Sequence, residues 1–274
     1  MNKNRYLIAL DMDGTLLTDD KTISVKTHKY LKKLDQLGHV VVLASGRPLR
    51  SLKYYADQLD LHSPLVTYNG SLVISEHHDD YPTKTILFPV SEIKAIITEI
   101  GLENLDNIMC ETPEHIWLLR EDEDLNSFFW HDGLEIYYGN ILETLQEPAM
   151  TLIMKLKNRS FELQEKVRTA IARYARHQVR FWWDSDYAEM FYSDVTKAHA
   201  IAEVADFYQI PHQNTIAFGD AENDVQMLTW AEYGIAMKNA NPHCRVHARF
   251  ISCLDNNHDG IIYELSKILQ VPLE

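Results

Sequence analysis

Two aspartates follow directly on a short apolar run near the start of the chain. Residues 6–10 read Tyr-Leu-Ile-Ala-Leu, and residues 11–16 read Asp-Met-Asp-Gly-Thr-Leu. A continuous apolar run of this length is typical of a parallel strand that is covered on both faces. Ligands of open α/β sheets bind beyond the carboxyl ends of such strands. The sequence therefore predicts that Asp11 and Asp13 lie at a ligand-binding edge of an α/β sheet.

The same pattern of an apolar run followed by polar or glycine residues recurs along the chain. It is seen where residues 40–44 precede Ser-Gly-Arg-Pro, where residues 65–68 precede Asn-Gly, and where residues 215–218 precede Gly-Asp-Ala-Glu-Asn-Asp. Parallel strands share one carboxyl edge, so we expect these segments to converge in space with Asp11 and Asp13.

Two carboxylates one residue apart repel each other unless a cation or a shared proton relieves the repulsion. A hard metal ion is therefore the first ligand to consider. The alternative is a strand end and turn whose acids are merely solvated. An EF-hand is excluded, because its loop has Gly at the sixth position and Glu at the twelfth. Counting from Asp11 places Gly14 fourth and Thr22 twelfth.

The chain resembles the Cof-type phosphatases of the haloacid dehalogenase (HAD) superfamily, which carry a class IIB cap. Four motifs in the family's order carry this resemblance: residues 11–16, Ser45-Gly46-Arg47, Lys197 and residues 219–224. Further matches lie at residues 67–70, 236–240 and 257–260. One departure is Ala198, where the family often has glycine. The resemblance implies an α/β fold, a Rossmann-like parallel sheet core (the HAD fold) with an inserted α+β cap domain.

The resemblance also implies a role for each motif residue. Asp11 would be the nucleophile that forms an aspartyl-phosphate, and Asp13 would be the general acid and base. Mg²⁺ would be bound by the carboxylates of Asp11 and Asp220 and by the main-chain carbonyl of Asp13. Asp224 would orient Lys197 or metal-bound waters. The positions implied to bind phosphate are Met12, Ser45, Gly46, Lys197 and Asn223.

The segment between the second and third motifs has its own pattern. Strand-like pieces lie at residues 86–88, 115–119, 150–156 and 179–183, and helical patterns at residues 91–100 and 160–177. Ser91 and Ser160 are the expected N-caps. This order predicts a sheet with two helices on one face. We therefore divide the chain into a hydrolase core, residues 1–83 and 188–274, and a cap, residues 84–187, with hinges near residues 81–83 and 185–187.

Composition narrows the class of partner. The formal net charge is −14, which argues against a nucleic-acid-binding surface. No apolar stretch approaches the ~20 residues needed to cross a bilayer. The three cysteines form no CxxC pair and no export signal is seen, so we expect a cytoplasmic protein whose partner is a small phosphorylated metabolite. The oligomeric state stays open.

The expected reaction is Mg²⁺-dependent hydrolysis of small phosphomonoesters through an aspartyl-phosphate. The resemblance implies sugar phosphates or phosphorylated cofactors, such as flavin mononucleotide or pyridoxal phosphate, as the substrate class. A phosphomutase or phosphotransferase is one alternative, and a signalling module with Asp11 as phosphoacceptor is another. Asp13 argues against the signalling module, because an acid and base beside the nucleophile should shorten the life of the intermediate.

Substrate choice would fall to residues of the cap. The side chains polar or aromatic enough to recognise a substrate are Glu111, His115, Trp182 and Trp183. The tryptophans fit packing positions as well, and His115 fits a sheet face, so the sequence assigns a substrate contact to none of them.

Overall fold

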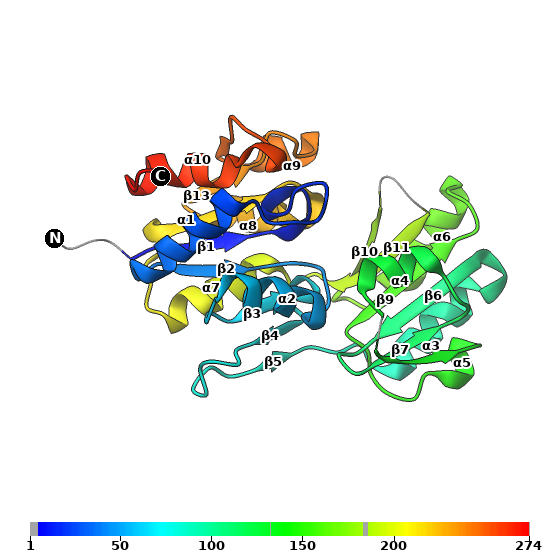
Figure 1. The fold of residues 1–274 in the computed structure, drawn as a ribbon. Coiled ribbons are helices and arrows are strands. Elements are labelled where there is room, and N and C mark those ends of the chain that lie inside the picture. Colours follow the sequence, from blue (N-terminus) through cyan, green and yellow to red (C-terminus); the bar gives the residue numbers. More distant parts are fainter. Residues whose placement is uncertain (1–4, 132, 183–185, 274) are drawn as a thin grey trace. The chain divides into compact units, whose positions relative to one another are not determined.

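The protein forms two compact units in the computed structural model, which describes residues 5–131, 133–182 and 186–273 (Figure 1). Residues 1–84 and 196–274 make up the core unit, and residues 85–195 make up the inserted unit. The inserted unit ends later than the predicted position 187. The reason is that strand β11, Tyr187–Tyr192, pairs with other strands of that unit.

A five-stranded parallel sheet in the order β14-β13-β12-β1-β2 forms the centre of the core unit. Its strands are β1 Leu7–Leu10, β2 Val40–Leu43, β12 Thr215–Gly219, β13 Tyr233–Ala236 and β14 Phe250–Ile251. Every residue of β1 is fully buried, as expected for a continuous apolar run between two helical layers. Because β1 pairs with both β2 and β12, the chain that follows β1 emerges between the ends of its neighbours.

A smaller sheet adds the third apolar run to this edge. β3, Leu65–Thr67, pairs antiparallel with β4, Leu72–Ile74, and the sheet continues to β5, Lys84–Thr85. A parallel bridge between Ala44 and Val66 joins β3 to the end of β2. The residues that follow β3 therefore lie next to those that follow β2.

The helices of the core unit fall into two packed groups. Their bounds are α1 Val25–Gln36, α2 Leu49–Leu59, α7 Lys197–Phe207, α8 Val225–Trp230, α9 Pro242–His247 and α10 Gly260–Leu269. α1 packs against α2 and α10, whereas α8 packs against α7 and α9. Thr196 caps α7 by accepting a hydrogen bond from the His199 amide, which places Lys197 in the first turn of the helix.

The inserted unit is an α+β structure built on a six-stranded mixed sheet in the order β10-β11-β9-β6-β7-β8. Its other strands are β6 Leu105–Glu111, β7 His115–Leu118, β8 Glu135–Tyr138, β9 Thr151–Leu156 and β10 His177–Phe181. Two long helices, α3 Val90–Ile100 and α6 Phe161–Ala172, pack on one face. The shorter helices are α4 Glu123–Phe129 and α5 Ile141–Thr144. The predicted arrangement of two helices on one sheet face is confirmed.

Three local predictions for the inserted unit differ in outcome. Ser160 caps α6 by accepting from the Leu163 amide, as predicted. Ser91 does not cap α3, because the helix already begins at Val90 with Pro89 in the N-cap position. Residues 86–88 form no strand, and Phe88 makes only an isolated bridge with Ala149.

His177 is a buried histidine in the core of the inserted unit. Its ring packs beside Phe88 and Tyr192, and Nε2 lies 3.0 Å from Glu92 Oε2. Burial lowers the pKa of His177 from 6.5, even though the charge of Glu92 opposes this shift. The folded state therefore keeps a neutral ring where the unfolded chain would already bind a proton.

This shift predicts a pH-dependent free energy of unfolding. The contribution of His177 is complete above pH 6.5, and it falls as the pH drops through 6.5 toward the lowered pKa, because only the unfolded chain takes up the proton there. Urea unfolding at several pH values should therefore show a smaller loss on acidification in His177→Gln than in wild type. His243→Gln, a substitution at an exposed histidine, is the control for the effect of replacing a histidine as such. Parallel profiles for wild type and His177→Gln would contradict this assignment.

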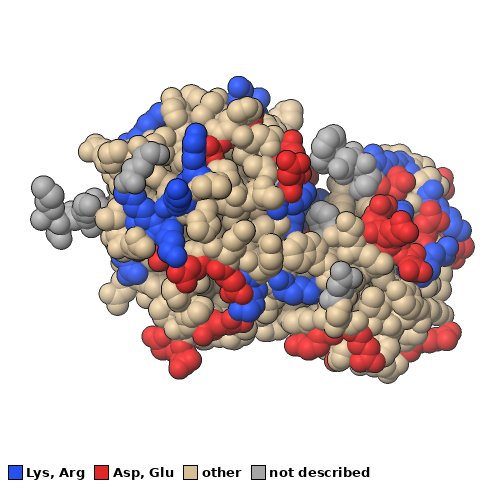
Figure 2. Space-filling model, in the orientation of Figure 1, with Lys and Arg blue, Asp and Glu red and all other residues tan. Residues whose placement is uncertain are grey.

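Charged side chains of both signs are mixed over the surface. Figure 2 shows acidic and basic groups on the visible face of each unit. The net charge of −14 is thus not gathered into one acidic surface on this face. Within the described residues, no helix combines the length and apolarity required to span a bilayer.

Candidate active site

A buried lysine joins two aspartates at the carboxyl edge of the core sheet. Lys197 Nζ lies 2.5 Å from Asp11 Oδ1 and 2.7 Å from Asp224 Oδ1. Only 1% of Lys197 is exposed. Burial alone would lower the pKa of Lys197, but the charges of Asp11 and Asp224 raise it above its ordinary value. The lysine is therefore a cation that the fold keeps out of contact with solvent.

Three carboxylates crowd around this cation. One oxygen from each of Asp11, Asp220 and Asp224 lies within 4.8 Å of the others. Burial and the charge of Asp224 raise the pKa of Asp11 well above its usual range, and the same causes raise the pKa of Asp220 to about 7. One lysine cannot balance three carboxylates, two of them buried and one half-buried, so the cluster suits an additional hard cation bound by oxygen ligands.

The two acids of residues 219–224 are held in different ways. Asp224 Oδ2 accepts hydrogen bonds from the amides of Asp220 and Ala221, both at 3.0 Å, and its Oδ1 faces Lys197. Asp220 instead accepts one bond, 2.9 Å long, from the Thr15 hydroxyl. Asp224 is thus committed to protein donors, whereas Asp220 keeps more capacity to bind a metal.

The turn at residues 12–16 sits close over Asp220 because Gly14 has no side chain. Gly14 has φ +71°, and a Cβ added there would lie 2.5 Å from Asp220 Oδ2. The side-chain amide of Asn239 donates a 2.7 Å hydrogen bond to the Gly14 carbonyl and holds the turn from the opposite end of the sequence. Glycine is required at position 14 because of its positive φ and because a Cβ would lie too close to Asp220.

Asp13 points to a separate group of cations. Arg47 donates from Nε to Asp13 Oδ2 at 2.6 Å and from Nη2 to Oδ1 at 2.7 Å, and Lys21 Nζ donates to Oδ1 at 2.7 Å. Burial would raise the pKa of Asp13, but the bonds and charges of Arg47 and Lys21 outweigh burial and lower it. Arg47 Nη1 is itself anchored on the Ser51 hydroxyl at 2.9 Å.

The positions predicted to bind phosphate surround these acids. Ser45 is buried, and its hydroxyl accepts from the Arg47 amide at 3.2 Å. A Cβ on Gly46 would lie 3.1 Å from Asn69 Nδ2, and Asn223 donates to Asn69 Oδ1 at 2.9 Å. The Met12 side chain is fully buried, so only its main chain could meet a ligand. The structure thus brings all of the predicted strand ends together.

Sequence reasoning gave no role to several residues of this site. Thr15, Arg47, Asn69 and Asn239 lie inside the quoted motifs, so hydrogen-bonding side chains beside the acids could have been anticipated. Lys21 had no such signal, because it lies in a polar loop beyond the first motif. Its contact with Asp13 depends on how that loop folds back.

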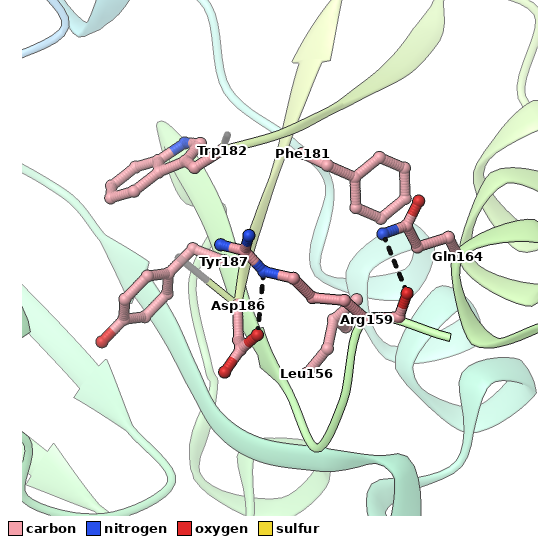
Figure 3. A pocket seen from close by; sticks show the side chains of 7 residues that line it. All are labelled: Leu156, Arg159, Gln164, Phe181, Trp182, Asp186 and Tyr187. Atoms are coloured by element: carbon pink, nitrogen blue, oxygen red, sulfur yellow. Dashed lines mark hydrogen bonds and ion pairs between the residues drawn. The ribbon is translucent and has the colours of Figure 1, made fainter. Parts of the chain in front are cut away.

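The side chains considered for substrate recognition are spread over the inserted unit. Glu111 is buried, and His115 Nδ1 lies 2.6 Å from Glu147 Oε1. Trp183 lies outside the described residues, as does Ser185 of the predicted hinge. Trp182 donates to Glu189 at 3.2 Å and borders a pocket of about 200 Å³ (Figure 3). The pocket is lined by Leu156, Arg159, Gln164, Phe181, Trp182, Asp186 and Tyr187, none of which belongs to the acidic site.

The family is decided by a match that covers most of the chain. The model of the haloacid dehalogenase-like hydrolases matches residues 8–265, which include every motif residue described above. The chain belongs to this family. HAD hydrolases with similar sequences include the 5-amino-6-(5-phospho-D-ribitylamino)uracil phosphatase YitU of Bacillus subtilis, which is 30% identical over 239 residues, 87% of this chain and 88% of that protein.

Other HAD proteins extend the comparison. The B. subtilis phosphatase YcsE, named for the same uracil substrate as YitU, is 28% identical and aligns over 93% of this chain and 92% of its own. The fold matches the subclass IIB sugar phosphatase BT4131 with a TM-score of 0.81 at 20% identity, covering 97% of this chain and 100% of that one. A HAD-like hydrolase from Bacteroides thetaiotaomicron gives a TM-score of 0.79 at 22% identity, covering 97% and 100%.

These matches confirm the predicted family and fold class, a parallel α/β core of HAD type with an added α+β unit. The predicted enzyme class is confirmed as well. The protein is a HAD-type phosphatase.

Proposed function

We propose that this HAD phosphatase is a Mg²⁺-dependent phosphomonoesterase that passes a phosphoryl group first to Asp11 and then to water. The observation that carries the proposal is the buried Asp11–Lys197–Asp224 arrangement beside Asp220, where a carboxylate, a fixed cation and spare oxygen ligands meet. A carboxylate nucleophile divides one difficult displacement into two easier ones.

The acidic cluster fits the magnesium ion that the reaction would use. Asp11, Asp220 and the main-chain carbonyl of Asp13 would hold it, since Mg²⁺ prefers oxygen ligands and usually keeps several waters. When bound, it would neutralise charge on the phosphoryl oxygens. Asp224 would serve the site through Lys197, because its oxygens already accept from that lysine and from two amides.

Side chains of the protein carry out the phosphoryl and proton transfers. A carboxylate oxygen of Asp11 bonds to phosphorus while the ester P–O bond breaks. The leaving oxygen takes a proton from the protonated fraction of Asp13, which is small because Arg47 and Lys21 lower the pKa of this carboxyl. Asp13 then removes a proton from water, whose oxygen bonds to phosphorus as the bond to Asp11 breaks. Lys197, with Ser45, Gly46, the Met12 main chain and Asn223, would hold the charged phosphoryl oxygens during both steps.

We propose sugar phosphates or phosphorylated cofactors and their precursors as the substrate class. Two relatives that align over most of this chain are named for 5-amino-6-(5-phospho-D-ribitylamino)uracil, which combines a sugar-like phosphate with a heterocycle. We propose further that the inserted unit acts as the cap that shields the aspartyl-phosphate from premature water.

Metal removal tests the proposal. Phosphate release from p-nitrophenyl phosphate and from a panel of phosphorylated metabolites is expected with Mg²⁺ and lost with chelator. Mg²⁺ should also raise the unfolding temperature of wild type, because it relieves repulsion among the buried acids. Asp220→Asn should lose both effects, whereas the exposed control Asp57→Asn should keep both. Full activity in chelator would contradict the metal dependence, and an isomerised ester in place of free phosphate would indicate a mutase.

A further inference from the structure

Asn69 connects two of the loops that are proposed to hold the phosphoryl group. Its main-chain amide donates to the Ser45 carbonyl at 2.9 Å, and its side-chain Oδ1 accepts from Asn223 Nδ2, also at 2.9 Å. We propose that Asn69 is a positioning residue that holds the Asn223 side chain with one amide hydrogen directed at the phosphoryl oxygens. The inference rests on the proposed function and adds to it a residue that acts through Asn223.

The backbone around Asn69 has a costly conformation. Tyr68, Asn69 and Gly70 follow β3 with φ values of +48°, +56° and +103°. A left-handed φ is uncommon for any residue with a side chain, and for a bulky residue such as Tyr68 it is an outlier. Such outliers persist where the surrounding structure holds them, and they cluster at functional sites. Asparagine tolerates this region better than most residues, so it can bring a carboxamide to position 69.

Contacts on both sides hold this turn in place. The Tyr68 amide donates to the Arg47 carbonyl at 3.2 Å. A Cβ added to Gly70 would lie 2.8 Å from the carbonyl oxygen of Thr196, the N-cap of α7. Tyr68 and Gly70 are buried, whereas Asn69 between them is half-buried. The Asn69 side chain therefore extends from a backbone that is tied to the loop after β2 and packed against the start of α7.

The hydrogen bond between the two asparagines determines which atom of Asn223 can meet a ligand. A carboxamide has a nitrogen with two hydrogens and an oxygen that only accepts. Asn223 Nδ2 donates one hydrogen to Asn69 Oδ1, and its second hydrogen remains for an acceptor such as a phosphoryl oxygen. If the Asn223 amide were turned over, its oxygen would replace the nitrogen and face the Asn69 oxygen without a hydrogen between them. The contact thus favours the orientation in which Asn223 is a donor.

The consequence is a loss of activity that depends on Asn223. Removing one preorganised donor to developing charge lowers kcat by about 10²- to 10³-fold, which is the loss expected for Asn223→Ala. Asn69→Gly removes the acceptor but not the turn, because glycine adopts φ +56° without strain. It should lower kcat/KM for p-nitrophenyl phosphate by roughly 10-fold, a part of the Asn223 effect. In the Asn223→Ala background the same change should cost less than about 2-fold, because residues that act as a unit are not additive.

The experiment is a double-variant cycle of Asn69→Gly and Asn223→Ala. For each protein, kcat, KM, the inhibition constant of inorganic phosphate and the unfolding temperature are measured. Inorganic phosphate should inhibit both single variants more weakly than wild type, because it would use the same donor. Gln209→Gly is the matched control, since Gln209 is an exposed amide side chain at φ +54° just after α7, and it should keep wild-type kinetics.

The outcomes separate a positioning role from a structural one. A residue that only supports the fold would lower kcat/KM by the same factor with and without the Asn223 side chain. Equal losses from Asn69→Gly in both backgrounds, or no loss in either, would overturn the role of Asn69 while leaving the proposed function intact. Wild-type activity in Asn223→Ala would also overturn it, because Asn69 would then have no donor to position. No phosphate release by wild type would overturn the proposed function instead.

Discussion

Asp11→Asn is expected to lose phosphate release by more than about 10³-fold, the scale seen when a covalent nucleophile is removed. The same variant should unfold at a temperature equal to or above that of wild type in metal-free buffer. An amide cannot form the phosphoryl intermediate, but it fits the space of the carboxylate and can still accept from Lys197. Loss of activity would then come without loss of the fold.

The stability side of this prediction follows from the charge of the site. Asp11 is ionised at a cost in the folded protein, since burial and the neighbouring Asp224 raise its pKa well above the usual range. Replacing it with a neutral amide removes one of the three crowded carboxylates. Thermal unfolding and phosphate release measured on the same preparations would test both parts. Wild-type turnover in Asp11→Asn would contradict the mechanism, and a large fall in its unfolding temperature would contradict the electrostatic account.

Lys197→Met is expected to abolish activity and, unlike Asp11→Asn, to destabilise the fold by about 3–5 kcal/mol, the range for removing one partner of a buried ion pair. The lysine is fully enclosed between Asp11 and Asp224. Without it, buried carboxylates face one another with no protein cation between them. Urea unfolding in metal-free buffer measures the effect, and Lys53→Met should stay within about 0.5 kcal/mol of wild type, as expected for a surface change.

The double variant Asp11→Asn with Lys197→Met separates charge from packing. Removing the Asp11 charge should recover part of the stability lost with the lysine, because the two side chains are in contact and their effects couple. If the double variant is destabilised by the sum of the single effects, the cost of Lys197→Met comes from packing and not from unbalanced charge.

The sequence predicted the core unit better than the inserted one, for physical reasons. β1, β2 and β12 are buried on both faces, so they read as apolar runs that any sequence scan finds. In the inserted unit, β8 is largely exposed and lacks that signal. The predicted boundary at residue 187 assigns all but the first residue of β11, Tyr-Ala-Glu-Met-Phe-Tyr, to the core, whereas this strand belongs to the inserted unit.

The residues of the site also differ in how far the sequence predicts them. Acids that follow buried strands could be expected to meet, because the topology of a parallel sheet brings strand ends together. Lys197 required the family resemblance, since a lone lysine in a first helical turn is usually solvated. Lys21 could not have been found from sequence, because its contact with Asp13 depends on a left-handed turn in the loop after the first motif.

The most direct test of the central claim is to trap the phosphoryl group on the chain. Wild type, Asp13→Asn and, as the negative control, Asp11→Asn would be mixed with p-nitrophenyl phosphate and Mg²⁺, quenched in acid during turnover, digested and analysed by mass spectrometry. Asp13→Asn should accumulate more of the intermediate, because hydrolysis of the aspartyl-phosphate needs the base. The mechanism predicts phosphorylation of the peptide at Asp11 and its absence in Asp11→Asn. Steady hydrolysis with no phosphorylated Asp11 peptide in wild type or in Asp13→Asn would contradict it.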